Sequence, residues 1–221
     1  MHKIIFFSDH NSLAKYLKWI HKSELHTYYF ISTKLIDQNE LEVLNLDNKL
    51  IAVARSEEDA MILAADFLAG TENDDFVLST DSVIPVSDWQ VELKNELDVL
   101  DEATVVFGRY YSSVIGGRHF VTSENMGFKY IDLTPQLIAN NIIDFAPTYL
   151  SHSIEVNYFP ISFTWFSSRI KGEVCEALNT ASCFEDFIDL SCKYLTLHSK
   201  RSKIFYSPNI ETMDAQLLTI G

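Results

Sequence analysis

The sequence predicts an α/β fold in which helices flank a mostly parallel central sheet. Over about the first hundred residues, short apolar runs alternate with segments whose apolar residues recur at helical spacing. The apolar runs, which we expect to form buried strands, cover residues 3–8, 27–32, 50–54, 76–78 and 104–107. Strands that alternate with helices typically form parallel sheets covered on both faces, and ligands bind beyond the carboxyl ends of such strands. Functional residues are therefore expected directly after the strands.

Helices are expected between these strands because of the spacing of the apolar residues. Ser56 is predicted to cap one of these helices, which ends near Gly70. Beyond about residue 108 the alternation becomes irregular, with a strand expected at 128–133 and a helix beginning at Thr134. Because the sequence contains no evident linker or internal repeat, we expect a single domain over residues 1–221, with an irregular C-terminal half.

Composition and charge exclude several classes of protein. Hydrophobic residues make up 47% of the 221 residues and charged residues 22%, which is typical of a globular protein with a sizeable core. Acidic residues outnumber basic ones by 31 to 17, and the resulting net charge of −14 opposes broad contact with nucleic acid or anionic lipid. No apolar stretch reaches the roughly 18 residues of a membrane span. The three cysteines match no zinc or disulfide spacing, so we expect reduced thiols and a cytoplasmic protein.

Polar turns follow three of the expected strands, where an α/β sheet binds its ligands. They comprise residues 9–11 after the first strand, 32–34 after the second and 79–82 after the fourth. In the last turn Asp81 lies among hydroxyl groups, and such an oxygen cluster can hold a hard divalent cation. The alternative is an ordinary polar turn in which these side chains bond the local backbone.

A later amphipathic helix carries acidic residues in its first turn. Ser182 with Glu185 fits a capping box, which would give Glu185 a structural role. Asp186 lies off the apolar stripe of this helix and has no capping role in that arrangement. It is either a catalytic carboxylate or a residue favoured by the helix dipole, and the two interpretations remain open.

These segments together resemble family 2 glycosyltransferases with the GT-A fold. In that family a strand ends in an Asp-x-Asp motif before a proline and a Trp-led helix, and a later Glu-Asp-x-x-x-Leu helix carries the catalytic base. A proline turn then precedes a metal-binding histidine by six residues. The matching segments here are residues 78–89, 184–193 and 206–214, with a weaker match at 7–11.

The sequence departs from the family pattern at three positions. Ser79 stands where the family usually has its first aspartate, Asp214 where it has histidine, and Lys193 where arginine is usual. Aspartate at position 214 still supplies a hard oxygen ligand, so a Mn²⁺ or Mg²⁺ site stays chemically plausible.

The resemblance implies roles for eight residues. Asp186 is the expected catalytic base, and Glu185 is expected to orient the acceptor or the base. Asp81 and Asp214 are the expected ligands of Mn²⁺ or Mg²⁺. The residues expected to contact the donor are Ser8, Asp9, Ser79, Asp81 and Lys193.

The resemblance also implies a reaction. We expect a metal-dependent, inverting hexosyl- or pentosyltransferase that moves a sugar from a nucleotide-diphospho-sugar, foremost a UDP-sugar, to a hydroxyl group of a glycan or protein. Residues 1–108 would form the nucleotide-sugar-binding half, and residues 109–221 the half that holds the acceptor and the catalytic base.

Two alternatives remain. Ser79 and Asp214 favour a non-catalytic homologue that binds a nucleotide sugar or a glycan. A cluster of basic residues at 193–203 is the basis of a minor alternative, a phage-type transferase that glycosylates hydroxymethylated bases of DNA.

Overall fold

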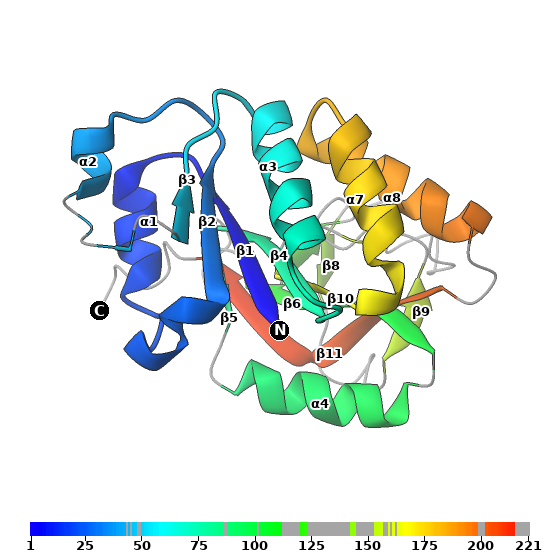
Figure 1. Ribbon diagram of the computed structural model, residues 1–221. Helices are drawn as coiled ribbons and strands as arrows, with labels where there is room; N and C mark the ends of the chain where they lie inside the picture. Colours follow the sequence, from blue (N-terminus) through cyan, green and yellow to red (C-terminus); the bar gives the residue numbers. More distant parts are fainter. Residues whose placement is uncertain are drawn as a thin grey trace.

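The computed structural model describes the chain in thirteen stretches. They are residues 1–42, 44, 46–47, 50–85, 88–100, 102–111, 120–122, 142–144, 153–156, 159, 161, 163–198 and 202–214. Among these residues, most of the strands form one nine-stranded sheet with helices on both faces (Figure 1). The expected strand at 128–133 and the helix expected at Thr134 lie outside the described residues.

The N-terminal half alternates strands and helices, as the sequence predicts. Its elements are β1 (His2–Phe7), α1 (His10–Leu17), η1 (Lys22–Thr27), β2 (Tyr28–Ser32), α2 (Gln38–Glu42), β3 (Ile51–Ala52), α3 (Glu57–Gly70), β4 (Phe76–Thr80), β5 (Val83–Pro85), α4 (Trp89–Val99) and β6 (Ala103–Tyr111). As expected, Ser56 caps α3, because its side chain accepts a hydrogen bond from the Asp59 N–H at 3.2 Å.

The C-terminal half contributes further strands and two packed helices. Its described elements are β7 (Phe120–Thr122), β8 (Ile142–Asp144), β9 (Ile154–Val156), β10 (Thr164–Phe166), η5 (Ser168–Ile170), α7 (Lys171–Thr180), α8 (Phe184–His198) and β11 (Lys203–Asp214). β11 contains the segment 206–214 that resembles the proline-turn motif, and its pairing with β6 is interrupted between Ser207 and Glu211.

The central sheet has the strand order β3-β2-β1-β4-β10-β6-β11-β5, with β9 paired to β11. β1 pairs in parallel with both β2 and β4, and β6 pairs in parallel with β11. β10, which the sequence did not predict as a strand, is antiparallel to its neighbours β4 and β6. The predicted mostly parallel α/β sheet is confirmed, and the parallel strands β1, β2, β3 and β4 end at the same edge.

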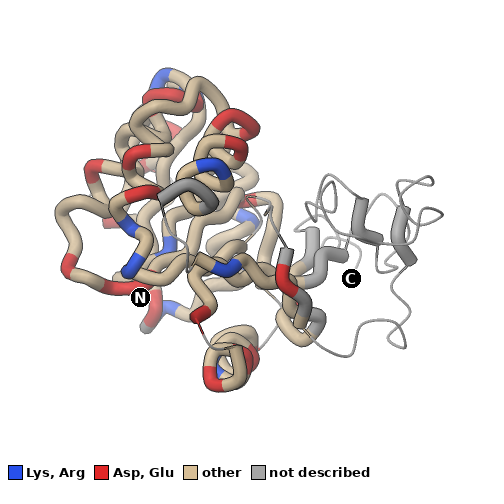
Figure 2. Tube along the Cα trace, turned by 90° about the vertical axis from the view of Figure 1, so that its right-hand side faces the viewer, with Lys and Arg blue, Asp and Glu red and all other residues tan. Residues whose placement is uncertain are grey.

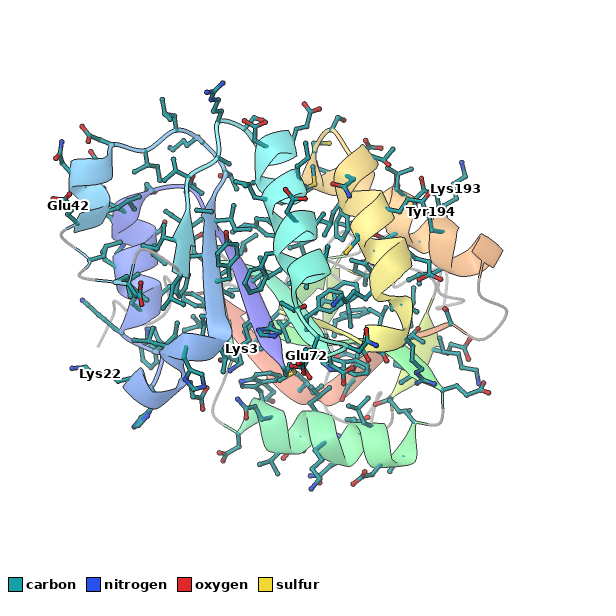
Figure 3. The ribbon with its side chains drawn as sticks, in the orientation of Figure 1. Lys3, Lys22, Glu42, Glu72, Lys193 and Tyr194 are labelled. Carbon is teal, nitrogen blue, oxygen red and sulfur yellow. The ribbon has the colours of Figure 1, made fainter. Side chains whose placement is uncertain are left out.

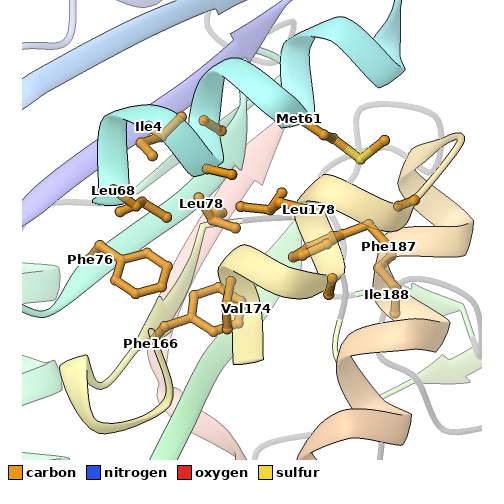
Figure 4. Packing of buried hydrophobic residues seen from close by; sticks show 14 of the residues in the cluster. Ile4, Met61, Leu68, Phe76, Leu78, Phe166, Val174, Leu178, Phe187 and Ile188 are labelled. Atoms are coloured by element: carbon orange, nitrogen blue, oxygen red, sulfur yellow. The ribbon is translucent and has the colours of Figure 1, made fainter. Parts of the chain in front are cut away.

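Side chains of β1 alternate between two cores, one on each face of the sheet. Ile4 and Phe6 pack in a cluster with α3, α7 and α8, whereas Ile5 and Phe7 pack with α1 and the loops around α2. Figure 4 shows the first cluster, in which Phe76 stacks on Phe166 with ring centroids 5.2 Å apart. α4 covers a third cluster on the same face of β4 as Val77.

Along the described part of the chain, acidic residues are more numerous than basic ones, in line with the net charge of −14 (Figure 2). None of the helices in the described ranges has the length and apolar character of a membrane span. All three cysteines are free thiols in the structure.

Candidate functional site

Asp81 lies at the carboxyl edge of the sheet, directly after β4. Its backbone N–H donates to the Phe6 carbonyl at 2.9 Å, which ties the turn to the end of β1. The side chain is only 6% exposed, and its Oδ2 atom accepts a hydrogen bond from the Ser12 hydroxyl of α1. The pKa of Asp81 is raised to about 6, mainly by burial and also by the nearby charge of Asp9, against the opposing effect of the Ser12 bond. Ionising a buried carboxylate lowers the stability of the fold. Asp81, at the edge of the sheet, is therefore a candidate functional group.

Ser8 and Asp9 form the turn between β1 and α1, next to Asp81. Asp9 is the N-cap of α1, because its Oδ1 atom accepts hydrogen bonds from the N–H groups of Asn11 and Ser12, both at 2.9 Å. The bond from the Ser12 N–H is the main cause that lowers the pKa of Asp9. Ser8 donates its hydroxyl to Asp9 at 3.3 Å and its backbone N–H to Asp81. The structure thus brings together three residues that the sequence predicted as donor contacts.

Sequence reasoning missed the part that Ser12 has in this group. The hydroxyl of Ser12 contacts the Asp9 carbonyl at 2.9 Å as well as the Asp81 carboxylate, so it links the ends of β1 and β4. The available signal was the position of Ser12 three residues after the N-cap Asp9, in the first turn of the helix. Lys34 lies in the polar turn that was expected after β2 but was not among the predicted site residues, and its charge helps to lower the pKa of Asp9.

Ser79 has a structural role that the motif comparison did not predict. Its side chain is fully buried, and its Oγ atom accepts a hydrogen bond from the backbone N–H of Phe163 at 3.0 Å. Phe163 has a φ of 56°, a left-handed conformation that is uncommon for an aromatic residue, and its ring packs edge-on against Trp89. Ser79 therefore stabilises the start of β10, and its proposed contact with the donor stays a prediction.

The start of α8 lies at the same edge of the sheet as Asp81. α3 and α8 begin at the same end of the molecule (Figure 1), where the Phe184 N–H donates to Glu57 at 3.3 Å. The ring of Phe184 also lies 4.9 Å from that of Phe6, the residue whose carbonyl accepts the Asp81 N–H. The predicted catalytic helix is therefore adjacent to the end of β1.

The capping interaction at α8 differs from the predicted one. The Oδ2 atom of Asp186, rather than Glu185, accepts hydrogen bonds from the Ser182 N–H at 2.9 Å and from the Ser182 hydroxyl at 3.2 Å. Asp186 is one position further along the helix, and its shorter side chain reaches back to the turn. The capping role that we expected for Glu185 was wrong, and Glu185 is exposed.

The other two predicted residues, Asp214 and Lys193, differ in how near they lie to the turn that holds Asp81. The backbone register places Asp214 opposite Val83, two residues beyond Asp81, which brings the end of β11 to the candidate site. Lys193 is exposed on α8, seven residues after Asp186, or about 10 Å along the helix. It extends outward from the helix (Figure 3). The structure does not bring Lys193 to the turn that holds Asp81.

A cavity of about 760 Å³ lies against the segments that follow β2 and β3. Aliphatic side chains and two carboxylates line it, and its volume falls within the range of small-molecule sites. The lining residues are Leu35, Ile36, Asp37, Leu41, Glu42, Ile51 and Val53. Leu35 is 73% exposed, so this part of the edge presents apolar surface to solvent.

The donor atoms at the edge fit a hard cation by their chemistry. Asp81 and Asp9 offer carboxylate oxygens, and Ser8 and Ser12 offer hydroxyls, all of which suit Mg²⁺ or Mn²⁺. Within the described ranges, no three His, Cys, Asp or Glu side chains come together as a complete ligand set. The phosphate oxygens of a nucleotide would have to supply the remaining ligands.

The sequence matches no protein-family profile, and no curated protein matches it. Among solved structures, the chain is similar to that of GalNAc-T7 with UDP, GalNAc and Mn²⁺, with a TM-score of 0.55 and 12% identity over 97% of this chain and 44% of that one. UDP-glucose pyrophosphorylase from Acinetobacter baumanii gives a TM-score of 0.46, with 8% identity over 97% of this chain and 88% of that one. A197 from STIV gives a TM-score of 0.41, with 16% identity over 96% of this chain and 84% of that one.

Of these three structural similarities, we use the one to GalNAc-T7 to infer the fold, because its TM-score exceeds 0.5. The chain spans less than half the length of that protein. At this identity the likeness defines the architecture alone, and the chain has a GT-A-like α/β fold, as the sequence predicts.

Replacing Ser79 tests its structural role. We expect Ser79→Ala to lower the free energy of unfolding by about 1 to 3 kcal/mol, because the buried N–H of Phe163 loses its acceptor. Urea denaturation measures the loss, with Ser82→Ala as the control, since Ser82 is exposed in the same turn. Equal stability of the Ser79→Ala variant and the wild type would show that this bond does not hold the start of β10.

The raised pKa of Asp81 makes stability depend on pH. Because the folded chain holds this proton more tightly than the unfolded chain, the free energy of unfolding falls as the pH rises from about 4 to about 6. Without divalent cations, we expect Asp81→Asn to match the wild type near pH 4 and to be about 2 to 3 kcal/mol more stable above pH 6. Urea denaturation at several pH values in EDTA measures this difference. A difference that does not change with pH would contradict the burial of an ionisable Asp81.

Proposed function

We propose that the protein is a glycosyltransferase that resembles family 2 and transfers a hexosyl or pentosyl group from a UDP-sugar to an acceptor hydroxyl, with inversion and with a divalent cation. The observation that supports this most is the buried Asp81 carboxylate, which lies with Ser8 and Asp9 at the carboxyl edge of a GT-A-like sheet. Ligands of open α/β sheets bind at this edge.

The unfavourable environment of Asp81 supports a binding role over a purely structural one. A carboxylate whose pKa rises to about 6 destabilises the folded chain near neutral pH, so the fold alone does not account for it. A bound cation would reverse this penalty, because positive charge favours the ionised form. Such a cation would neutralise the donor diphosphate and the departing nucleoside diphosphate.

The neighbouring residues suit the remaining parts of a nucleotide donor. Ser8 and Ser12 offer hydroxyls beside Asp81, and Lys34 offers a positive charge near the same turn. The cavity next to Leu35 and Val53 has room for a nucleobase. These contacts would hold the donor with its diphosphate at Asp81 and its base beyond the ends of β2 and β3.

Asp186 is the proposed catalytic base. It lies in the first turn of α8, at the end of the molecule where β1 ends, and its carboxylate is only partly buried. Its bonds to Ser182 occupy one oxygen, Oδ2, and fix the orientation of the carboxylate. The other oxygen would take the proton from the acceptor hydroxyl as that hydroxyl attacks the sugar.

A second candidate is a non-catalytic homologue that binds a nucleotide sugar. It is favoured by the structural roles of two motif residues, because Ser79 holds Phe163 and Asp186 caps α8. Slow release of UDP from a panel of UDP-sugars with Mn²⁺ separates the candidates, since only an enzyme would release it. The DNA-acceptor hypothesis loses one member of its basic cluster, because Lys203 lies 3.7 Å from Glu102 as an ion pair.

The cation role of Asp81 is tested by the affinity for UDP. We expect Mn²⁺ to strengthen UDP binding to the wild type by about tenfold or more, and to leave the affinity of Asp81→Asn nearly unchanged. Isothermal titration with and without Mn²⁺ measures both, and Ser82→Ala serves as a control in the same turn. If Asp81→Asn keeps the full gain from Mn²⁺, the cation binds elsewhere.

Asp186 is tested by the rate of transfer. Asp186→Asn keeps an oxygen to accept the Ser182 bonds, but it cannot take a proton at neutral pH. We expect turnover to fall by about 10² to 10⁴ while UDP affinity and thermal stability stay near wild type. Asp189→Asn, at an exposed position one turn further along α8, is the matched control and should lose far less. Retention of more than about a tenth of the turnover by Asp186→Asn would assign the base to another group.

A further inference from the structure

β11 contains an irregularity midway along its length. Ser207 pairs with Gly108 of β6, whereas the next paired residue of β11, Glu211, lies opposite Arg109. Residues 208–210 therefore have no counterpart on β6 and form a bulge of three residues. Beyond it, β11 continues to Asp214, whose backbone lies opposite Val83 of β5.

Two hydrogen bonds hold the bulge in its conformation. The Asn209 N–H donates to the Ser207 hydroxyl oxygen at 3.2 Å, and the Asn209 side-chain amide donates to Oε1 of Glu96 at 2.6 Å. Glu96 is a buried carboxylate of α4, and its Oε2 accepts a hydrogen bond from the Ser153 hydroxyl. Both oxygens of Glu96 thus have a donor, and one of them fixes the bulge to α4.

Gly108 leaves the space that the bulge needs. A Cβ atom at this position would lie 2.2 Å from the carbonyl oxygen of Ile210, which is backbone and cannot move aside without changing the bulge. Ile210 is itself buried in the cluster beneath α4. The bulge is therefore built into the packing of β6, β11 and α4.

The bulge determines which residues of β11 reach the candidate site. If residues 208–210 instead paired with β6 in regular register, each later position of β11 would pair three residues further along β6. An odd shift also reverses the face on which every later residue of a strand falls. Asp214 would then be displaced both along the sheet and between its faces.

We propose that the bulge at 208–210, held by Asn209 on Glu96, is a positioning device that sets the place of Asp214 in the cation site. This inference rests on the proposed function, in which Asp214 and Asp81 bind the divalent cation. Asn209 and Glu96 act through Asp214 and contact neither the cation nor the donor.

The test measures Mn²⁺ binding in the presence of UDP by the electron paramagnetic resonance of free Mn²⁺. Asn209→Asp keeps the shape of the side chain but places a carboxylate against Glu96. We expect this variant to bind Mn²⁺ about tenfold more weakly or worse, because the bond becomes a repulsion. Combining it with Glu96→Gln should restore the affinity to within about threefold, since the Gln amide can donate to the introduced carboxylate and its oxygen can accept from Ser153.

Ser153→Ala is the matched control, because it removes the other donor to Glu96 and leaves the bulge intact. Thermal melting reports on the fold of each variant, and Asn209→Ala replaces Asn209→Asp if the latter does not fold. A purely structural role would lower the melting temperature and leave the Mn²⁺ affinity of the folded protein unchanged, which would overturn the proposal. Full restoration by the double variant, with normal binding by Ser153→Ala, would support it.

Asp214→Ala distinguishes the positioning role of the bulge from the cation-binding role of Asp214. Weak Mn²⁺ binding by Asp214→Ala together with normal binding by the Asn209 variants would overturn the positioning role alone. Normal binding by Asp214→Ala would remove Asp214 from the cation site, and the positioning role would fall with it.

Discussion

The parallel pairing of β1 with both β2 and β4 is the constraint on which the candidate site depends. Because the three strands run in the same direction, the turns after β1 and β4 meet at one edge, and the Asp81 N–H bonds the Phe6 carbonyl there. The strict alternation of β1 side chains then holds this edge between two cores. α1 and α8 consequently begin beside the same strand end, although they cover opposite faces of the sheet.

Asp81 connects the stability of the fold to its proposed chemistry. Its carboxylate is removed from water by the packing of the turn, and Ser12 offsets only part of the cost of ionisation. A site of this kind is preorganised for positive charge, since the fold already gathers its carboxylate and hydroxyl oxygens at one edge. The adjacent Asp9 has a structural role, because its capping bonds to the start of α1 stabilise its charge.

The sequence was sufficient to predict the features that depend on local pattern. Apolar runs predicted the parallel strands, and the polar turns after them placed Asp9 and Asp81 at the ligand-binding edge, where the structure brings them together with Ser8. It did not predict β10, because the antiparallel insertion of a three-residue strand between β4 and β6 depends on contacts far apart in the chain.

The motif comparison was less reliable for residues with a second role. Ser79 accepts the N–H of a strained Phe163, and such a role depends on a segment more than eighty residues away. The sequence suggested Glu185 for the cap of α8, whereas the backbone geometry of the turn at Ser182 gives this role to Asp186. The bulge of β11 was equally hidden, because Pro208 indicated a turn and gave no sign of the pairing on either side of it.

The central claim is that a divalent cation and a nucleoside diphosphate bind together at the edge that holds Asp81. The most direct test is a crystal structure of the protein with UDP and Mn²⁺, in which the anomalous scattering of manganese locates the ion. The account predicts a single strong peak at coordinating distance from an Asp81 carboxylate oxygen, about 2.0 to 2.3 Å, with the UDP phosphates as further ligands. Manganese and UDP bound away from Asp81 would contradict it.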